Sequence, residues 1–180
     1  MEIFRELDKI PQFKDSVVTI GTFDGCHRGH QDIIKKVIYN SEINGSNSIL
    51  VTFEPHPRHV LQPEVKLPIL MHIDRKLDFL KSFNLNAVVV IPFDEQFSKM
   101  TANNFLKNII LKQLNASKII VGYDHHFGFN RDGSPDFLKN ESSDSNFEVE
   151  IVEPISDQEM IISSTHIRQS IQNGYVRRAS

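Results

Sequence analysis

Short apolar runs alternate with longer amphipathic stretches along this chain. The apolar runs have the length of strands, and they predict five of them, over residues 17–21, 48–53, 87–91, 118–122 and 147–152. The longer stretches carry apolar residues at helical spacing, for example Phe105, Leu106, Ile109 and Ile110. They predict helices over residues 30–40, 74–83, 102–114, 135–139 and 165–173.

This alternation predicts an α/β fold, a parallel five-stranded sheet with helices on both faces, built from right-handed βαβ units. Ligands of such sheets bind at the carboxyl ends of the strands, near the point where the strand order reverses. The motifs described below all follow predicted strands, as that rule requires. Residues 140–146 contain three serines and predict a flexible polar loop.

Length and composition place limits on the classes of function. With 180 residues, the chain is expected to form one domain over residues 1–180. Its net charge of -3 argues against a dedicated nucleic-acid binder. A single cysteine, Cys26, excludes an internal disulfide and suits a reducing compartment. No apolar stretch reaches the ~20 residues of a membrane span, and residues 1–5 show no signal-peptide pattern, so a cytoplasmic location is expected.

Residues 21–30, which read GTFDGCHRGH, carry the most specific chemistry. They lie between an apolar strand and a run with helical period, so the strand is expected to end in a glycine-rich turn that opens a helix. Helix N-termini offer unpaired N–H groups that attract phosphate, and His27 and His30 lie one helical turn apart. The GxGxxG and Walker motifs are both absent. The pattern predicts an HxGH phosphate site, with a nucleotide as its ligand.

A second motif, TFEPHPRH at residues 52–59, follows the second predicted strand. Pro55 and Pro57 fix the backbone in an extended form, which makes a stiff segment with apolar rings. A proline-stiffened loop with no other role is the simpler reading. Its position at the carboxyl end of a strand favours a wall of the substrate pocket.

A third motif, GYDHHFGFNRDG at residues 122–133, follows the fourth predicted strand. Phe127 could stack on a planar heterocycle, and Arg131 could hold a phosphate through its guanidinium fork. Asp124 could accept hydrogen bonds from a ring N–H or a ribose hydroxyl. Alternatively, Asp124 only caps a turn and Arg131 is only solvated.

A fourth motif, ISSTHIR at residues 162–168, opens the last predicted helix. Ser163 or Ser164 is a suitable N-cap, and Arg168 lies about one turn inside. In isolation this pattern indicates an ordinary capped helix. Together with HxGH, it predicts the second half of a triphosphate clamp.

GTFDGCHRGH and ISSTHIR resemble the motifs of the HxGH nucleotidyltransferases, which share a Rossmann-like α/β fold. FEPHPR and VGYDHHFGFNRDG are similar to the FMN adenylyltransferase (FAD synthetase) module of bacterial bifunctional riboflavin kinase/FAD synthetases. The resemblance covers roughly residues 17–178. It implies transfer of AMP from ATP to FMN, giving FAD and pyrophosphate. It also implies Mg²⁺ bound through the substrate phosphates, with no metal site made by the protein.

The resemblance assigns roles to the matching positions. His27, His30, Ser164 and Arg168 would be the catalytic residues, acting on the phosphates of ATP. The remaining ATP-binding residues would be Gly21, Phe23, Asp24, Gly29, Ser163 and Thr165, of which Gly21, Phe23 and Asp24 line the adenosine side. The FMN-binding residues would be Pro55, Pro57, Asp124, Phe127 and Arg131, with Arg131 near phosphate.

Two positions depart from the family pattern. His126 and His166 stand where the family often has arginines, in Asp-Phe-Arg-Phe-Gly and ISSTRIR. If either arginine's charge contributes to phosphate binding, affinity here would be weaker and would depend on pH. The family usually continues into a riboflavin kinase domain, for which the residues after 174 leave no room. No riboflavin phosphorylation by this chain is therefore expected, with the kinase domain adjoining it in a full-length protein.

Three other interpretations stay open from the residues. One is a related HxGH adenylyltransferase that acts on another mononucleotide or on phosphopantetheine. Another is a non-catalytic flavin or nucleotide sensor on the same fold. The third is a metal site made by histidine pairs, but the glycines that flank His27 and His30 suit phosphate better. No nucleic-acid or membrane partner is expected.

Overall fold

The strands form one parallel sheet with a single reversal of strand order. The computed structural model describes residues 1–157 and 160–175, and within them the sheet has the order β1-β4-β3-β2-β5-β6. Its members are β1 (Glu2–Phe4), β2 (Ser16–Ile20), β3 (Asn47–Glu54), β4 (Ala87–Pro92), β5 (Ala116–Gly122) and β6 (Glu148–Val152). All five pairings between neighbours are parallel.

The predicted α/β fold and parallel sheet are confirmed, but the expected number of five strands was wrong. The sixth strand, β1, lies at the edge of the sheet, where Ile3 is paired with Val88 of β4. With three residues it is too short to show a periodic pattern. A small antiparallel pair, β7 (Ser156–Asp157) and β8 (Met160–Ile161), was also not predicted.

Each predicted helix is present with shifted ends. The α-helices are α1 (Arg28–Asn44), α2 (Pro57–Leu61), α3 (Ile73–Lys81), α4 (Glu95–Ser98), α5 (Ala102–Asn104), α6 (Pro135–Ser143) and α7 (Ser164–Gln172). Helix α5 continues as a π-helix, η2 (Phe105–Gln113), and short 3₁₀ turns are η1 (Leu7–Lys9) and η3 (Phe129–Arg131). The short helices α2 and α4 were not predicted. Helix α6 extends into the stretch 140–146 that was expected to be a loop.

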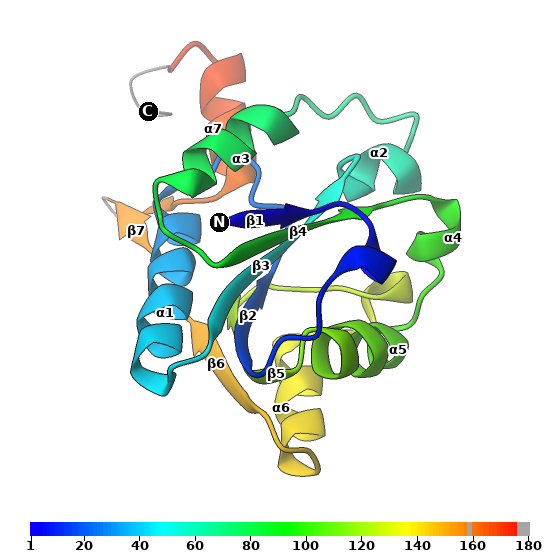
Figure 1. Ribbon diagram of the computed structural model, residues 1–180. Helices are drawn as coiled ribbons and strands as arrows, with labels where there is room; N and C mark the ends of the chain where they lie inside the picture. The colour runs from blue at the N-terminus through cyan, green and yellow to red at the C-terminus, as the bar shows by residue number, and fades with distance from the viewer. Residues whose placement is uncertain (158–159, 176–180) are drawn as a thin grey trace.

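The helices cover the two faces of the sheet, as predicted (Figure 1). On one face, α1 and α3 pack through Ile34, Leu77 and Leu80. On the other face, α5, η2 and α6 pack through residues such as Leu106 and Leu138. Neighbouring strand residues point to opposite faces and are buried on both, which explains why the strands read as continuous apolar runs. None of the helices in the described ranges is long and apolar enough to cross a membrane.

The strand order reverses next to β2, the strand that precedes GTFDGCHRGH. From β2 the chain proceeds through β3 to β4 on one side, and then crosses to β5 and β6 on the other. Ligands of open α/β sheets bind outside the carboxyl ends of the strands at this crevice. The turn after β2 and the loop after β5 both open there.

Candidate functional site

The turn between β2 and α1 has a tightly constrained backbone. Phe23, Gly25 and Cys26 have φ values of 47°, 80° and 41°, which for a phenylalanine and a cysteine is uncommon. Phe23 is only 2% exposed and Cys26 only 1%, so burial of both side chains supports this conformation. His27 is the N-cap of α1, and its Nδ1 accepts the backbone N–H of His30 at 3.4 Å.

The rings of His27 and His30 are stacked, with centroids 3.6 Å apart and planes 20° from parallel. Burial lowers the pKa of His30 to about 3, and the positive charges of His27 and Lys76 act in the same direction. Burial also lowers the pKa of His27, against the opposing charges of Asp124 and Asp24. Both rings are therefore neutral at pH 7, and each has one N–H to donate.

One ring nitrogen of this pair, His30 Nδ1, is available to form a hydrogen bond. His30 Nδ1 is buried and has no hydrogen-bond partner among the residues that the structure describes. The ring also packs edge-on against Phe23, with centroids 5.1 Å apart. A buried polar atom without a partner is unfavourable unless a ligand or water supplies one.

Asp24 joins the turn to distant parts of the chain. Asp24 is only 1% exposed. Its carboxylate accepts hydrogen bonds from the backbone N–H groups of Leu70 and Met71, at 3.0 and 2.9 Å. It also forms an ion pair with Arg168 of α7. The side chain expected on the adenosine side is thus engaged inside the protein, and a contact with adenosine stays a prediction.

The N-terminus of α7 lies against the same turn. Ser163 is its N-cap and accepts the backbone N–H of His166 at 3.3 Å, while Ser164 donates to the Asp24 carbonyl at 2.8 Å. Arg168 Nε donates to the carbonyl of Pro68 at 2.8 Å. The structure therefore brings HxGH and the ISSTHIR motif together, although they are far apart in sequence. Thr165 is exposed in the first turn of α7.

Close packing explains Gly21 but not Gly29. A Cβ at Gly21 would lie 3.1 Å from the Phe23 ring, which is tighter than an ordinary contact. A Cβ at Gly29 would lie 3.4 Å from the His27 ring and 3.9 Å from the carbonyl of Ile162, which are ordinary van der Waals distances. The packing of the turn therefore does not require a glycine at position 29, and its role beside ATP stays a prediction.

The FEPHP segment ends β3 and begins α2. Pro57 is the first residue of α2, Pro55 is exposed, and His56 is the N-cap that accepts the backbone N–H of Arg58 at 3.2 Å. Burial lowers the pKa of His56 to about 4, with the charge of Asp24 opposing and that of Arg168 adding to the effect. The charges that act on His56 thus include Asp24 of the β2–α1 turn, although the motif analysis gave His56 no role in nucleotide binding.

The loop after β5 contains an aromatic cluster. Phe127 is 8% exposed and packs on Phe105 and Phe137, with centroid separations of 5.7 and 6.0 Å. His125 is stacked on it at 5.5 Å, with planes 22° apart. Phe127 is thus mainly a core residue, and its stacking on a ligand stays a prediction. Asp124 and Arg131 are exposed in this loop.

Sequence reasoning also missed Lys76, a lysine of α3 that is only 5% exposed. Its Nζ donates to the carbonyl of Thr22 at 2.6 Å, which places the charge directly at the turn. The signal was present in the sequence. Lys76 lies beside Leu77 and four residues before Leu80, so the helical period places it at the border of the apolar stripe.

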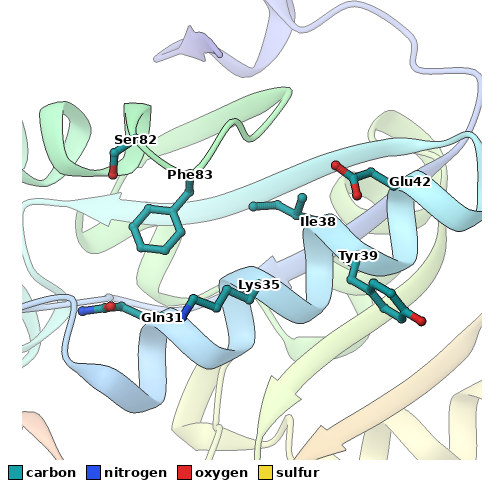
Figure 2. A pocket seen from close by; sticks show the side chains of 7 residues that line it. All are labelled: Gln31, Lys35, Ile38, Tyr39, Glu42, Ser82 and Phe83. Atoms are coloured by element: carbon teal, nitrogen blue, oxygen red, sulfur yellow. The ribbon is translucent and has the colours of Figure 1, made fainter.

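A separate groove of about 500 Å³ lies along α1 (Figure 2). It is lined by Gln31, Lys35, Ile38, Tyr39, Glu42, Ser82 and Phe83. The Phe83 ring faces α1 across it. None of the four motifs' predicted binding residues lines this groove, so it is distinct from the candidate site.

No metal site is preassembled in the described ranges. Within residues 1–157 and 160–175, no group of three or more His, Cys, Asp or Glu side chains could hold an ion. The metal site considered for the histidine pairs is therefore not supported there. That Mg²⁺ would be held by substrate phosphates and water stays a prediction.

Comparison with known proteins decides the family. The family model for FAD synthetase matches residues 9–166, which include all four motifs except the last two residues of ISSTHIR. The chain belongs to the FAD synthetase family. The matched residues include the HxGH turn, the FEPHP segment and the loop after β5.

Curated relatives agree with this assignment. A bifunctional riboflavin kinase/FMN adenylyltransferase of Buchnera aphidicola subsp. Acyrthosiphon pisum is 30% identical over 100% of this chain and 58% of its own length. A protein of Geobacillus thermodenitrificans named for the same two activities is 36% identical, over 88% of this chain and 84% of its own. The Escherichia coli K12 relative is 28% identical over 92% of this chain and 52% of its own. The chain thus spans little more than half the length of several relatives.

Solved structures share the fold. A structure named macrolide-efflux protein, from Streptococcus pneumoniae, has a TM-score of 0.84 and 30% identity, over 98% of this chain and 57% of that one. Pantoate-β-alanine ligase from Francisella tularensis has a TM-score of 0.56 and 12% identity, over 100% and 80%. At that identity the ligase shows only a common fold.

Proposed function

We propose that this member of the FAD synthetase family transfers AMP from ATP to FMN, giving FAD and pyrophosphate. The observation that carries the proposal is the meeting of two helix N-termini, those of α1 and α7, around the stacked neutral pair His27 and His30. Helix N-termini and uncharged imidazole donors suit a polyphosphate. The FAD synthetase match supports FMN as the acceptor.

The reaction needs no protein nucleophile. An oxygen of the FMN phosphate attacks the α-phosphorus of ATP, a new P–O bond forms, and the bond between the α-phosphorus and the bridging oxygen of pyrophosphate breaks. Catalysis then consists of positioning and of stabilising charge on the phosphate oxygens. His27 and His30 would donate hydrogen bonds to those oxygens, and the unpartnered His30 Nδ1 could be satisfied by bound substrate or water.

The second helix would hold the departing pyrophosphate. Ser163, Thr165 and the backbone N–H groups at the start of α7 would bind its oxygens, since Ser164 in the same helical turn already contacts the carbonyl of Asp24. Arg168 would contribute positive charge from the same helix, although its guanidinium is paired with Asp24 in the structure described. Mg²⁺, when bound with ATP, would neutralise phosphate charge.

FMN would lie between the FEPHP segment and the β5 loop. Pro55 and Pro57 would form one wall and Asp124 the other, with Arg131 available to the FMN phosphate. Gly21 and the buried Phe23 would shape the adenosine side. All of these residues follow the carboxyl ends of β2, β3 or β5.

The proposal extends to the chain's organisation and location. Residues 1–180 would form one FMN adenylyltransferase domain, with a riboflavin kinase domain adjoining it in a full-length protein, as the names of the curated relatives suggest. The residues after 174 on which that expectation rests lie, except for Tyr175, outside those that the structure describes. A cytoplasmic location stays a prediction from the sequence.

The test is chromatography of purified protein with ATP, Mg²⁺ and either FMN or riboflavin. FAD and pyrophosphate formed from FMN, with no FMN formed from riboflavin, are expected. If FMN binds but no FAD forms at high protein concentration, the chain is a sensor. If FMN neither binds nor reacts, another mononucleotide or phosphopantetheine is the acceptor to test next.

A further inference from the structure

Lys76 is a buried cation that the reaction described above does not use. It comes from the core-facing side of α3, and its Nζ reaches the carboxyl ends of β2 and β3. Burial lowers its pKa, while the charges of Cys26, Asp24 and Glu54 oppose the effect. Among the described residues, no carboxylate lies within ion-pair distance of this ammonium group. A buried charge without a direct counter-ion is costly unless hydrogen bonds compensate it, so the groups that bind this ammonium group are informative.

The lysine holds one particular carbonyl group. Lys76 Nζ donates to the Thr22 carbonyl at 2.6 Å, and the Thr52 hydroxyl donates to the same oxygen at 3.2 Å. Lys76 Nζ also lies 3.4 Å from Thr52 Oγ1, which closes a triangle. Thr22 is therefore fixed from α3 and from β3 at the same time.

The fixed carbonyl immediately precedes the strained part of the turn. Phe23, the next residue, has a φ of 47°, and its ring packs edge-on against His30 at 5.1 Å. His30 is in turn stacked on His27. A chain of direct contacts therefore runs from Lys76 through Thr22 and Phe23 to the histidine pair.

The charge of Lys76 also acts on the same histidine. Besides burial and His27, Lys76 is a cause of the lowered pKa of His30. A positive charge that acts on the ring favours its neutral form, in which one nitrogen donates and the other accepts. Lys76 is thus linked to the imidazole of His30 both through contacts and through its charge.

We propose that Lys76 is a positioning residue for nucleotidyl transfer, which clamps the Thr22 carbonyl and thereby holds the HxGH turn and His30 in place. The proposal rests on the proposed function. Lys76 acts through the protein and touches no substrate, because its Nζ is directed at Thr22 and Thr52.

The experiment compares Lys76→Met with a matched control, Lys81→Met. Met keeps most of the length of the side chain without the charge, and Lys81 lies on the same helix but is exposed and paired with Asp78. Circular dichroism first establishes that both variants are folded. For Lys76→Met, kcat should fall by about a hundredfold, as for misplaced catalytic groups, with the KM for ATP unchanged. Lys81→Met should behave as wild type.

Two results would overturn the proposal. A Lys76→Met variant with wild-type kcat would show that the clamp has no role in positioning. A raised KM for ATP with unchanged kcat would mean that Lys76 binds ATP directly.

A second readout does not depend on activity. NMR titration of the His30 ring should give a higher midpoint in Lys76→Met than in wild type, because a nearby positive charge is removed. An unchanged midpoint would contradict an electrostatic effect of Lys76 on His30. If wild type makes no FAD, the proposed function fails, whereas this titration still tests whether the charge of Lys76 acts on His30.

Thr52→Val serves if Lys76→Met does not fold. Val has the shape of Thr and is favourable in a strand, so only the hydroxyl that donates to the Thr22 carbonyl and accepts from Lys76 is lost. A fall in kcat of about fivefold is expected, the effect of roughly one net hydrogen bond. Wild-type kcat in folded Thr52→Val would overturn the clamp.

Discussion

The carboxylate of Asp24 forms an ion pair with the guanidinium of Arg168, a residue 144 positions later in the chain. The Asp24 side chain is 2% exposed and that of Arg168 10%, so water screens the pair weakly. Asp24 lies in the turn between β2 and α1, and Arg168 lies in α7. The ion pair therefore holds the N-termini of α1 and α7 close to each other, and these two N-termini make up the candidate phosphate site.

The Asp24–Arg168 pair should contribute strongly to stability. Asp24→Asn leaves a largely buried arginine without its counter-charge, and a loss of about 3–5 kcal/mol in the free energy of unfolding is expected. Urea denaturation measures it. Adding Arg168→Met to Asp24→Asn should cost much less than the sum of the single changes. Strict additivity in this double-mutant cycle would contradict a direct interaction.

His30 should be essential for turnover but not for flavin binding. His30→Ala removes the neutral imidazole from the α1 N-terminus, and FAD formation is expected to fall by about a hundredfold or more. FMN binding, followed by flavin fluorescence, should be largely retained. His72→Ala, at an exposed N-cap without a side-chain hydrogen bond, is the matched control and should keep wild-type turnover. A wild-type rate for His30→Ala would remove the residue from the phosphate clamp.

Three partly buried histidines should make the protein sensitive to acid. Burial is the main cause that lowers the pKa of His30 to about 3 and those of His56 and His125 to about 4. In the unfolded chain a histidine titrates near ~6.5, so below that pH the unfolded state binds more protons. Stability should therefore be complete above about pH 6.5 and should fall steadily as the pH drops toward 4.

The acid effect can be assigned to one residue by urea denaturation between pH 7.5 and 4.5. Each such histidine contributes a slope of at most about 1.4 kcal/mol per pH unit in this range. His30→Asn, which cannot titrate, should show a shallower dependence than wild type. The same slope in both proteins would contradict a neutral buried His30.

Asp124 should set the requirement for FMN. It is exposed in the loop after β5, and its charge raises the pKa of His27 against the effect of burial. Asp124→Asn should raise the KM for FMN by about tenfold, the effect of one charged hydrogen bond. Asp136→Asn, an exposed aspartate of α6, is the matched control. An unchanged KM for FMN would exclude Asp124 from the flavin pocket.

Gly128 should be needed for the shape of the same loop. Its φ is 76°, and an added Cβ would lie 2.5 Å from the backbone nitrogen of Ala102. Gly128→Ala should therefore destabilise the protein and raise the KM for FMN. Gly45→Ala is a matched control, because Gly45 has a φ of 62° but nothing within 4 Å. It should cost only the backbone strain of about 1–2 kcal/mol and leave the KM unchanged. If Gly128→Ala and Gly45→Ala lowered the free energy of unfolding equally, the neighbours of Gly128 would have to move aside at no cost, which would contradict this prediction.

The sequence by itself determined the features that depend on neighbours along the chain. Strands show a side-chain period of two residues, and helices bring together residues three or four positions apart. These two periods predicted the parallel α/β sheet, the turn after the first long strand and the proximity of His27 to His30. The family could be identified for the same reason, because its motifs are short and contiguous. Even Ser163 as an N-cap was a local inference.

Only the tertiary structure decided which distant groups meet. The edge strand β1 exists because β4 supplies its hydrogen bonds, and three residues carry no pattern of their own. Phe127 is a core residue because Phe105 and Phe137 surround it, which its loop motif could not indicate. Asp24 with Arg168, and Lys76 with Thr22, are pairs set by the packing of whole elements across the sheet. Local spacing fixes the direction of a side chain within its element, but the partner it meets depends on where the other elements pack.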